Sequence, residues 1–403
     1  LHGGGVTGGG QQEEEGEEEG EGEGEAEEGS SAAVCTYPLP GSLPCRRVSD
    51  HYERLNKISE GTYGIVYRAK NLDNGEIVAL KRLKLDKEQE GFPITALREI
   101  TTLLTNKHPN LVDVKEVVVG DNLDSIFVVM EFMEHDLKNL MDNMRHNFTQ
   151  AEVKCLLIQL LEAIDSLHEN FVLHRDLKTS NILFNNQGRL KLCDFGLARR
   201  YGDPIEKTYT QMVVTQWYRP PELMLGKEGY GTALDMWGVG CIFAELLNRK
   251  PLFPGKGELD QLDKIFRMLG TPTREMWRDF ETLPMVQKFK FKHYPGPNLR
   301  DLFPRIQILS DQPVLSDVGM DLLLSFLQYD PEKRISAADA LNHPYFRESP
   351  LPQSIDLMPT FPSLNTQALR QRKRTQSEEM IDQILRENEE REEEMRKKRS
   401  KFW

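Results

Sequence analysis

The sequence predicts an α+β protein of two lobes, a small lobe rich in β-strands with one helix and a larger helical lobe. Three observations indicate this fold class. Five short β-rich runs fall between residues 52 and 132, and a single stretch of helical periodicity interrupts them. After residue 136 the periodicity is mostly helical. With 403 residues, the chain is long enough for both lobes to bury a substantial core.

A tail precedes the predicted lobes. Residues 1–48 are rich in Gly, Glu and Ser and hold too few large apolar side chains to build a core, so we expect disorder. Eleven glutamates lie in residues 11–29, and without them the chain has 53 acidic against 51 basic residues. The formal net charge of -13 is therefore a property of the tail. Two roles stay open for it, a solvated linker or an electrostatic arm for basic partners.

The small lobe, residues 52–132, is predicted to hold five strands and one helix. The β-rich runs are residues 55–59, 65–70, 77–83, 112–119 and 126–131. Asp73, Asn74 and Gly75 predict a hairpin turn between the second and third runs. Between the third and fourth runs, apolar residues recur at helical spacing after a proline: Ile94, Leu97, Ile100, Leu103 and Leu104.

The larger lobe is predicted to occupy residues 133–346. Residues 153–167 carry an apolar stripe at helical spacing, and residues 234–247 are apolar on nearly every face, which is typical of a buried central helix. A proline-containing extension follows at residues 347–369. The charged segment 370–403 has a thin apolar set, which supports only a marginal helix.

Cysteine usage and hydropathy exclude several classes of protein. The five cysteines are widely spaced and form no CxxC pair, which argues against a disulfide framework or a zinc site and for a reducing compartment. No apolar run approaches membrane-spanning length, so we expect no membrane partner.

Two motifs of the larger lobe carry the chemistry. They are the loop His174-Arg175-Asp176-Leu177-Lys178-Thr179-Ser180-Asn181 and, thirteen residues after its Asn, the triplet Asp194-Phe195-Gly196. Phosphoryl transfer needs a carboxylate that orients the attacking hydroxyl and ligands that hold Mg²⁺ against the phosphates. Asp176 is placed for the first task, and Asn181 and Asp194 for the second. Lys178 comes two residues after Asp176, which is the arrangement of serine/threonine kinases. Thr215 is expected to form a supporting hydrogen bond.

The small lobe supplies candidate phosphate-binding groups. Residues 59–64, Ser59-Glu60-Gly61-Thr62-Tyr63-Gly64, lie between the first two strands, where glycine lets backbone amides approach phosphate oxygens. Ser59 replaces the first Gly of the usual pattern, so this motif alone also fits a plain hairpin turn. Lys81 on the third strand is placed to contact the α- and β-phosphates. Glu99 on the predicted helix is its natural ion-pair partner and would fix its position.

Two side chains near this site have open roles. Met130, in the connector 126–136 whose backbone is expected to pair with adenine, lines the back of the pocket, packs in the core, or does both. Cys193, directly before Asp194, is either a reactive thiol or, as the pattern favours, an inert buried one.

Three arginines are predicted to converge on the segment between Gly196 and Glu222. They are Arg98, Arg175 and Arg199. Like charges gathered at one point repel unless an anion joins them. A phosphate on Thr210 would supply charge-assisted pairing.

Over residues 52–346 the chain resembles the cyclin-dependent kinases. The resemblance is carried by Glu60-Gly61-Thr62-Tyr63-Gly64, by Pro93-Ile94-Thr95-Ala96-Leu97-Arg98-Glu99 and by Val213-Val214-Thr215-Gln216-Trp217-Tyr218-Arg219. The second of these runs, together with Glu134-His135-Asp136-Leu137-Lys138 and the Glu-rich tract, is similar to the PITSLRE subfamily, cyclin-dependent kinase 11. The fold implied is the bilobal protein kinase fold.

The resemblance implies transfer of the γ-phosphate of ATP, with Mg²⁺, to Ser or Thr before Pro in protein substrates. It implies a cyclin of the L type that pushes the helix inward so that Glu99 meets Lys81. It also implies activation through Thr210, inhibitory phosphorylation at Thr62 and Tyr63, and a nuclear role in transcription, pre-mRNA splicing and the cell cycle, with the cytoplasm as a further location. Direct nucleic-acid binding is not expected of the kinase domain. The implied ATP-binding residues are Ile58, Ser59, Glu60, Gly61, Thr62, Tyr63, Gly64, Ile65, Val66, Ala79, Lys81, Glu99, Met130, Glu131, Met133, Asp136 and Leu183.

The chain departs from the subfamily in several places. Ala96 replaces a Ser, Gln216 replaces a Leu, and Pro220 replaces the Ala of Ala-Pro-Glu. The activation segment is one residue longer than usual near Lys207, so Thr208 competes with Thr210 as the phosphosite. Glu222 is still expected to pair with Arg334 in a buried bridge.

Three functional hypotheses stay open. The first is an active serine/threonine kinase. The second is a kinase-fold scaffold that binds partners without turnover; such scaffolds typically lose Lys81, Asp176, Asn181 or Asp194, whereas this chain keeps all four. The third is that the tails bind nucleic acids or splicing factors.

Overall fold

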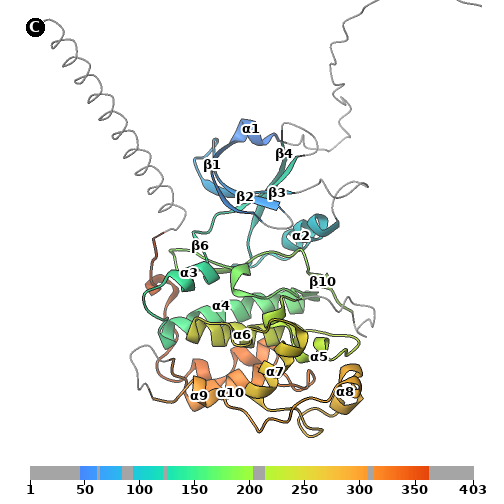
Figure 1. The fold of residues 1–403 in the computed structure, drawn as a ribbon. Helices are drawn as coiled ribbons and strands as arrows, with labels where there is room; N and C mark the ends of the chain where they lie inside the picture. The colour runs from blue at the N-terminus through green and yellow to red at the C-terminus, as the bar shows by residue number, and fades with distance from the viewer. Residues whose placement is uncertain are drawn as a thin grey trace, which may run out of the picture. The chain divides into compact units, whose positions relative to one another are not determined.

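The computed structural model describes residues 46–60, 64–83, 94–120, 125–202, 214–306 and 313–362. All of them belong to one compact unit, Cys45–Trp403. Figure 1 shows a β-rich lobe stacked on a larger helical lobe, as the sequence predicts. The expected marginal helix of residues 370–403 lies outside the described residues.

The small lobe is built on a five-stranded antiparallel sheet in the order β1-β2-β3-β5-β4. Its strands are β1 (Tyr52–Glu60), β2 (Gly64–Asn71), β3 (Ile77–Leu83), β4 (Val114–Val119) and β5 (Ile126–Glu131). All five predicted strands are confirmed. Gly75, in the predicted turn between β2 and β3, has a φ of 76°, which glycine adopts readily.

The folded lobe begins earlier than the sequence predicts. Arg46 to Val48, which we assign to the disordered tail from composition, are part of it. Arg47 forms a β-bridge with Val119, and Val48, at the start of α1 (Val48–His51), is buried. The apolar Val48 side chain packs against buried side chains of the sheet, and a compositional average over residues 1–48 cannot detect one such residue.

The single helix of the small lobe, α2 (Ile94–Thr105), carries apolar residues on two faces. Ile100 and Leu103 are buried, whereas Ile94, Leu97 and Leu104 are 65%, 55% and 49% exposed. The predicted apolar stripe is therefore split between the core and an uncovered outer face. Glu99 lies on the buried side.

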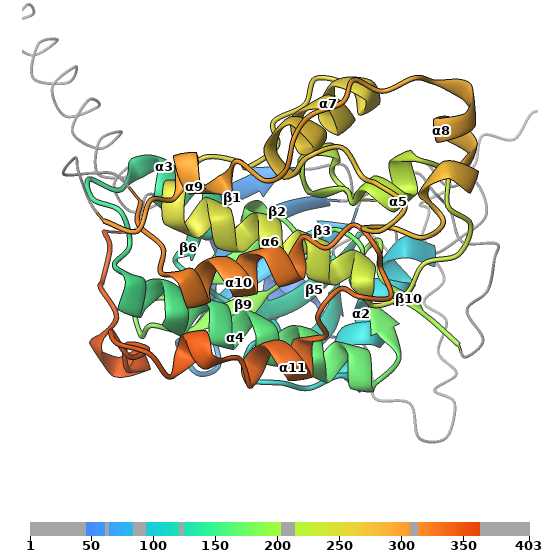
Figure 2. The same ribbon diagram turned by 90° about the horizontal axis from the view of Figure 1, so that it is seen from below.

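The larger lobe is centred on α4 (Gln150–Glu169) and α6 (Ala233–Asn248), which pack against each other. Figure 2 shows α6 between α4 and α7 (Glu258–Leu269), with α10 (Asp317–Phe326) beside it. Thr149 and Glu152 form a capping box at the start of α4. The other helices are α3 (Leu137–Asn143), α5 (Pro221–Met224), α8 (Pro284–Lys288), α9 (Leu299–Leu302) and α11 (Ala337–Leu341), with short 3₁₀ turns at Thr179–Asn181, Gln216–Tyr218, Phe280–Thr282, Pro344–Phe346 and Ile355–Leu357.

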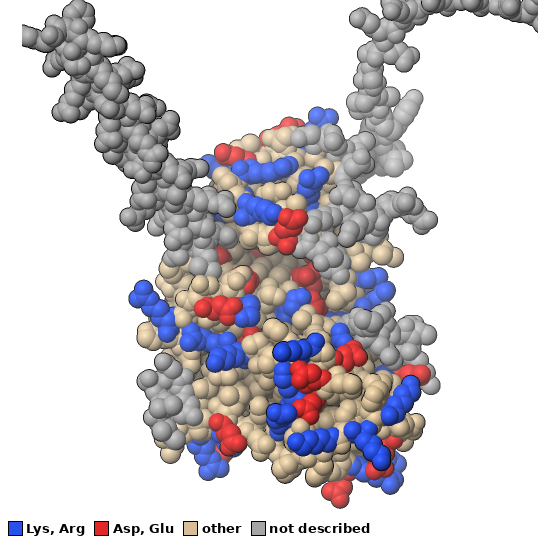
Figure 3. All heavy atoms as spheres, viewed as in Figure 1, with Lys and Arg blue, Asp and Glu red and all other residues tan. Residues whose placement is uncertain are grey.

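Short strands lie where the two lobes meet. β6 (His135–Asp136), β8 (Ile182–Phe184) and β9 (Leu190–Leu192) form one antiparallel ribbon, and β7 (Val172–Leu173) pairs with β10 (Arg199–Arg200). Figure 3 shows the surface hollowed between the lobes, with charged side chains at the rim. The loop 174–181 lies between β7 and β8, and the triplet 194–196 follows β9, so both predicted motifs adjoin these short strands.

The predicted buried bridge between Glu222 and Arg334 is confirmed. Arg334 donates to both Glu222 carboxylate oxygens, at 2.7 and 3.0 Å, and both side chains are almost fully buried. Arg334 also donates to the carbonyl of Ala233 at 2.6 Å, so it joins α5 to the start of α6. Within the described ranges, no helix is both long and apolar enough to span a membrane.

Candidate active site

A buried carboxylate of α6 holds the loop 174–181 in place. Asp235 is 1% exposed and accepts hydrogen bonds from the backbone N–H groups of His174 and Arg175, both at 2.9 Å. His168 Nε2, on α4, lies 3.0 Å from the same carboxylate. Burial alone would raise the pKa of Asp235, but these partners outweigh it and hold the pKa below its ordinary value. They also fix Arg175 at a φ of 66°, which a non-glycine residue rarely adopts.

Asp176 stands at the centre of a hydrogen-bond network. Its Oδ2 accepts from Lys178 Nζ at 2.6 Å and from Asn181 Nδ2 at 3.1 Å. Its Oδ1 accepts from Thr215 Oγ1 at 2.8 Å and from the Thr215 backbone N–H at 3.2 Å, which is the supporting contact expected of Thr215. The carboxylate is thus held in one orientation, as is needed by a group that positions an acceptor hydroxyl.

The lysine of β3 and the glutamate of α2 form an ion pair across the small lobe. Lys81 Nζ lies 2.6 and 2.7 Å from the two carboxylate oxygens of Glu99. Both side chains are buried, 9% and 7% exposed. Burial would lower the pKa of Lys81, but the carboxylates of Glu99 and Asp194 raise it above the ordinary value. Lys81 is therefore fully charged at neutral pH.

Asn181, just before β8, and Asp194, just after β9, are the predicted Mg²⁺ ligands. Asn181 Nδ2 donates to the backbone carbonyl of Asp176 at 2.9 Å, so the amide oxygen of Asn181 remains available to a ligand. Among the described residues, no group donates a hydrogen bond to the Asp194 carboxylate. The following residue, Phe195, is fully buried, with its ring 4.9 Å from that of His174. A carboxylate and an amide oxygen fit the hard-oxygen preference of Mg²⁺.

Several of the implied nucleotide-binding residues face one another across neighbouring strands. The directly opposed pairs are Val66 with Lys81, Ala79 with Met130, and Asp136 with Leu183. Opposed residues in an antiparallel pair lie on the same face, so each pair lines one surface. Gly61, Thr62 and Tyr63 lie outside the described residues.

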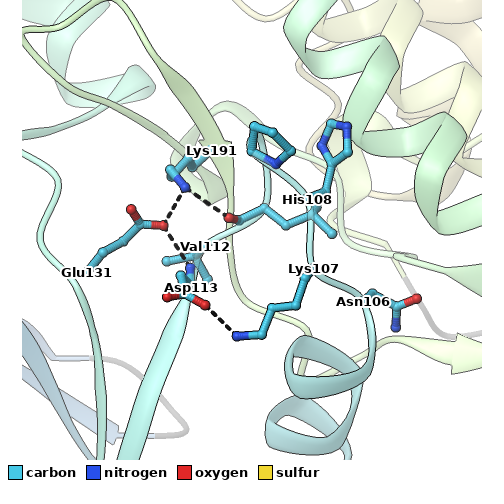
Figure 4. A pocket seen from close by; sticks show the side chains of 9 residues that line it. Asn106, Lys107, His108, Val112, Asp113, Glu131 and Lys191 are labelled. Atoms are coloured by element: carbon cyan, nitrogen blue, oxygen red, sulfur yellow. Dashed lines mark hydrogen bonds and ion pairs between the residues drawn. The ribbon is translucent and has the colours of Figure 1, made fainter.

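The side chain of Glu131 faces away from the cleft. It pairs with Lys191 Nζ at 2.7 Å and accepts from the backbone N–H of Asp113 at 2.7 Å. Figure 4 shows these contacts at a pocket of about 420 Å³ behind the connector between the lobes. The pocket is lined by Asn106, Lys107, His108, Pro109, Leu111, Val112, Asp113, Glu131 and Lys191. The backbone N–H of Glu131 also donates to the carbonyl of Asp113, at 3.1 Å, so only the backbone carbonyl of Glu131 is left to serve adenine.

The three predicted arginines lie close enough for their charges to interact. Burial lowers the pKa of Arg98, and the positive charges of Arg199 and Arg175 lower it further. Arg175 is held by Leu197 O at 2.7 Å and by the hydroxyl of Tyr230 at 2.6 Å. An anion placed among these cations would relieve their repulsion. Thr208 and Thr210 lie outside the described residues.

Cys193 fits the inert alternative rather than the reactive one. Its thiol donates to the carbonyl of Asn181 at 3.2 Å. Burial, and then the Asp194 carboxylate, raise the pKa of the Cys193 thiol well above its ordinary value. The nucleophilic thiolate is therefore scarce at neutral pH.

The departures from the subfamily pattern are accommodated locally. Gln216 Nε2 donates to the carbonyl of Gly255 at 2.8 Å, and Trp217 Nε1 donates to the same oxygen at 3.0 Å. Pro220 is the N-cap of α5, a position outside the helical hydrogen bonds where a missing N–H does no harm. Ala96 is buried on the inner face of α2, which favours a small side chain.

Two buried acids of α6 were missed by the sequence analysis. Asp235 is one of them. The other, Glu245, is fully buried and accepts from Tyr218 at 2.6 Å and Thr179 at 3.2 Å, and burial raises its pKa. The signal that could have found them was two carboxylates in an otherwise apolar helix, since acids are buried only when they have partners.

Comparison with known proteins agrees with this geometry. A protein kinase domain model matches residues 52–346. Cyclin-dependent kinase 11B of Rattus norvegicus is 54% identical over 329 residues, which cover 82% of this chain and 73% of the rat protein. The chain belongs to the protein kinases, in the cyclin-dependent kinase 11 group.

Other members of this kinase group are similar over the same region. Cyclin-dependent kinase G-2 of Oryza sativa subsp. indica is 62% identical over 321 residues, which cover 80% of this chain and 45% of the rice protein. Cyclin-dependent kinase 11A of Homo sapiens is 55% identical over 329 residues, 82% of this chain and 41% of the human protein. The kinase chain thus spans less than half the length of these two relatives.

Proposed function

We propose that this chain is a cyclin-dependent serine/threonine kinase that transfers the γ-phosphate of ATP to protein substrates. The observation that carries the proposal is the fixed orientation of the Asp176 carboxylate by Lys178, Asn181 and Thr215. A scaffold without turnover has no use for a carboxylate restrained on both oxygens.

In the proposed reaction, some side chains of the site act on the protein substrate and others on ATP. Asp176 orients the acceptor hydroxyl and receives its proton late in the transfer. Lys178 lies beside this carboxylate and offsets charge on the transferring group. Lys81, held by Glu99, contacts the α- and β-phosphates. Asn181 and Asp194 would hold Mg²⁺, which neutralises phosphate charge when it is bound.

A backbone feature supports a preference for Pro after the phosphorylated residue. Val214, next to Thr215, has a φ of 67°, and its carbonyl accepts from Arg219 Nε at 3.3 Å and Nη2 at 3.0 Å. We propose that the substrate residue after the acceptor passes this occupied carbonyl. Most residues would leave an N–H unpaired there, at a cost of about 1–3 kcal/mol, whereas proline has no N–H.

We propose that a cyclin, of the L type, docks on α2. Ile94, Leu97 and Leu104 form an exposed apolar face on the helix that carries Glu99, and such faces mark interaction sites. Phosphorylation at Thr210, with Thr208 as the alternative, would bring an anion to the three arginines. Phosphorylation at Thr62 or Tyr63, beside Gly64 of β2, would place negative charge near the triphosphate and inhibit.

The wider role rests on the family likeness alone. We propose a nuclear kinase, with some protein in the cytoplasm, that acts in transcription, pre-mRNA splicing and the cell cycle. Arg370, Arg372, Lys373 and Arg374 would serve as a nuclear signal. Imaging of a tagged chain tests the location, and exclusion from the nucleus would contradict it.

Transfer of label from γ-labelled ATP to a Ser-Pro peptide tests the activity. The full chain with an L-type cyclin is expected to label the peptide, and Asp176→Asn is expected to lower kcat by about 100- to 10,000-fold. Asp301→Asn, which changes an exposed aspartate of α9, is the matched control and should keep full activity.

Two outcomes would contradict parts of the proposal. Absence of transfer by the phosphorylated, cyclin-bound wild type, or transfer that Asp176→Asn leaves intact, would favour the scaffold. Purification of the chain from cells with a different cyclin would overturn the L-type assignment but not the enzyme.

A further inference from the structure

A C-terminal strap runs back over the larger lobe toward the cleft. We give this name to residues 347–362, which lie beyond the end of the matched kinase domain at residue 346. The buried Lys154 of α4 donates to the carbonyls of Glu348 at 3.0 Å and Pro350 at 2.8 Å. Further along, the backbone N–H of Gln353 donates to the carbonyl of Ala151 at 2.9 Å. Figure 1 shows the strap rising along the edge of the lobe toward β6.

The strap then crosses the turn between β8 and β9 in close contact. A Cβ at Gly188 would lie 2.0 Å from the carbonyl oxygen of Ile355 and 2.8 Å from Met358 Cβ. Gly188 also has a φ of 79°. Only glycine fits between the turn and the strap, and Met358 is buried there.

Phe361 ends this path against β6 and β8. Its backbone N–H donates to Asn186 Oδ1 at 2.8 Å, and Asn186 Nδ2 returns a hydrogen bond to the Phe361 carbonyl at 3.0 Å. Its ring meets the rings of His135 and Phe184 edge-on, each with centroids 6.1 Å away. His135 Nδ1 is buried without a hydrogen-bond partner among the described residues, so packing contributes strongly to the orientation of this ring.

The side chains on the two faces of the ribbon formed by β6 and β8 have different surroundings. His135 lies opposite Phe184, and both are buried against Phe361. The next opposed pair, Asp136 and Leu183, is only half-buried and lies on the other face, because successive side chains of a strand alternate. Asp136 and Leu183 belong to the proposed ATP site. Phe361 therefore supports, from behind, the ribbon whose front contacts the nucleotide.

We propose that Phe361 is a positioning residue for ATP, which acts through His135 and Phe184 on Asp136 and Leu183. The inference rests on the proposed ATP site. Loss of the ring would leave a void behind the ribbon and let its front face shift. Asp176, Lys81 and Asp194 lie on other elements, so nucleotide binding should weaken while the chemical step stays unchanged.

Calorimetric titration of the full chain with a non-hydrolysable ATP analogue and Mg²⁺ tests this inference. Phe361→Ala is expected to weaken binding by about 3- to 10-fold, the range that loss of one ring's contacts produces. Phe361→Trp keeps an aromatic edge and should restore near wild-type affinity. Leu357→Ala, which removes a side chain that is 69% exposed on the same strap, is the matched control and should bind as wild type.

The outcomes separate the inference from the proposed function. Wild type that fails to bind the nucleotide contradicts the kinase proposal itself. Wild-type affinity in Phe361→Ala, even with a lowered melting temperature, overturns the positioning role and leaves the kinase proposal standing. Equal weakening by Leu357→Ala also overturns it. Should Phe361→Ala not fold, Phe361→Leu decides by the same measurement, and in the cyclin-bound enzyme the effect must fall on the KM for ATP rather than on kcat.

Discussion

At the scale of single residues, three of the five described non-glycine residues with a positive φ lie at the candidate active site. Arg175, Asp194 and Val214 have φ values of 66°, 64° and 67°. Arg175 lies in the loop 174–181, Asp194 begins the triplet 194–196, and Val214 precedes Thr215, which contacts Asp176. Such conformations persist only where the surroundings enforce them. Asp235 enforces the conformation of Arg175, and Arg219 that of Val214.

The carbonyl of Val214 allows a direct test of substrate choice. Arg219→Leu removes the guanidinium that occupies this oxygen, so an ordinary substrate N–H can reach it. The ratio of kcat/KM for a Ser-Pro peptide over a Ser-Ala peptide is expected to fall by up to about tenfold, the effect of about one hydrogen bond. Glu258→Gln, which removes only the 2.7 Å ion pair to Arg219, is the control and should keep the ratio. An unchanged ratio in Arg219→Leu would contradict the role of Val214.

At the scale of elements, the sequence predicts what is local and misses what depends on distant partners. Strands and helices follow from periodicity, and Lys81, Glu99 and Asp176 follow from motif spacing. Asp235 meets Arg175 from 60 residues away, and Phe361 meets Asn186 from 175 residues away. No periodicity encodes such pairings, because they arise when whole elements pack. The side-chain direction of Glu131 is equally a product of packing against Lys191.

The loop between α2 and β4 carries a group that makes stability depend on pH. Burial lowers the pKa of His108 below its ordinary value of 6.5, Lys191 lowers it further, and Glu162 opposes them. At pH values between the lower folded-state pKa and the higher unfolded-state pKa of His108, the unfolded chain binds more protons than the folded chain. The free energy of unfolding therefore falls as pH drops below about 6.5, and it is unaffected by His108 above that pH.

Replacement of this histidine should remove its share of the pH dependence. In the wild type, the backbone N–H of Asn110 donates to His108 Nδ1 at 3.1 Å. His108→Asn keeps an acceptor for this N–H but has no group that titrates. Melting temperatures measured from pH 5 to 8 are expected to fall less steeply below about pH 6.5 in the variant than in wild type. Parallel curves for the two proteins would show that His108 does not contribute.

At the scale of the whole molecule, the two lobes meet through side chains on both sides of the cleft. Lys191 of β9 joins Glu131 of β5 behind the connector, and the Asp194 carboxylate of the larger lobe helps to raise the pKa of Lys81 in the small lobe. The uncovered outer face of α2 is the part of the small lobe that is best suited to receive a partner, since its inner face already packs on the core.

A charge on that face should block activation by the cyclin without unfolding the chain. Leu97 is 55% exposed, so Leu97→Glu leaves the core intact but buries a carboxylate when the partner binds. Affinity for the cyclin is expected to fall at least about tenfold, with a matching loss of stimulated transfer. Leu72→Glu, at a position that is 52% exposed in the turn between β2 and β3, is the control. Equal cyclin affinity in wild type and Leu97→Glu would place the partner elsewhere.

The ion pair between Lys81 and Glu99 sets a limit on what such a partner can achieve. The resemblance to cyclin-dependent kinases implies that a cyclin brings these residues together, yet the single chain already holds them at 2.6 Å. If a fraction f of free chains occupies this arrangement, a partner that only moves α2 can raise activity by no more than 1/f. Activation larger than that reciprocal must come from another change, such as an anion among Arg98, Arg175 and Arg199. Measurement of f in the free chain would therefore apportion activation between the partner and the phosphate.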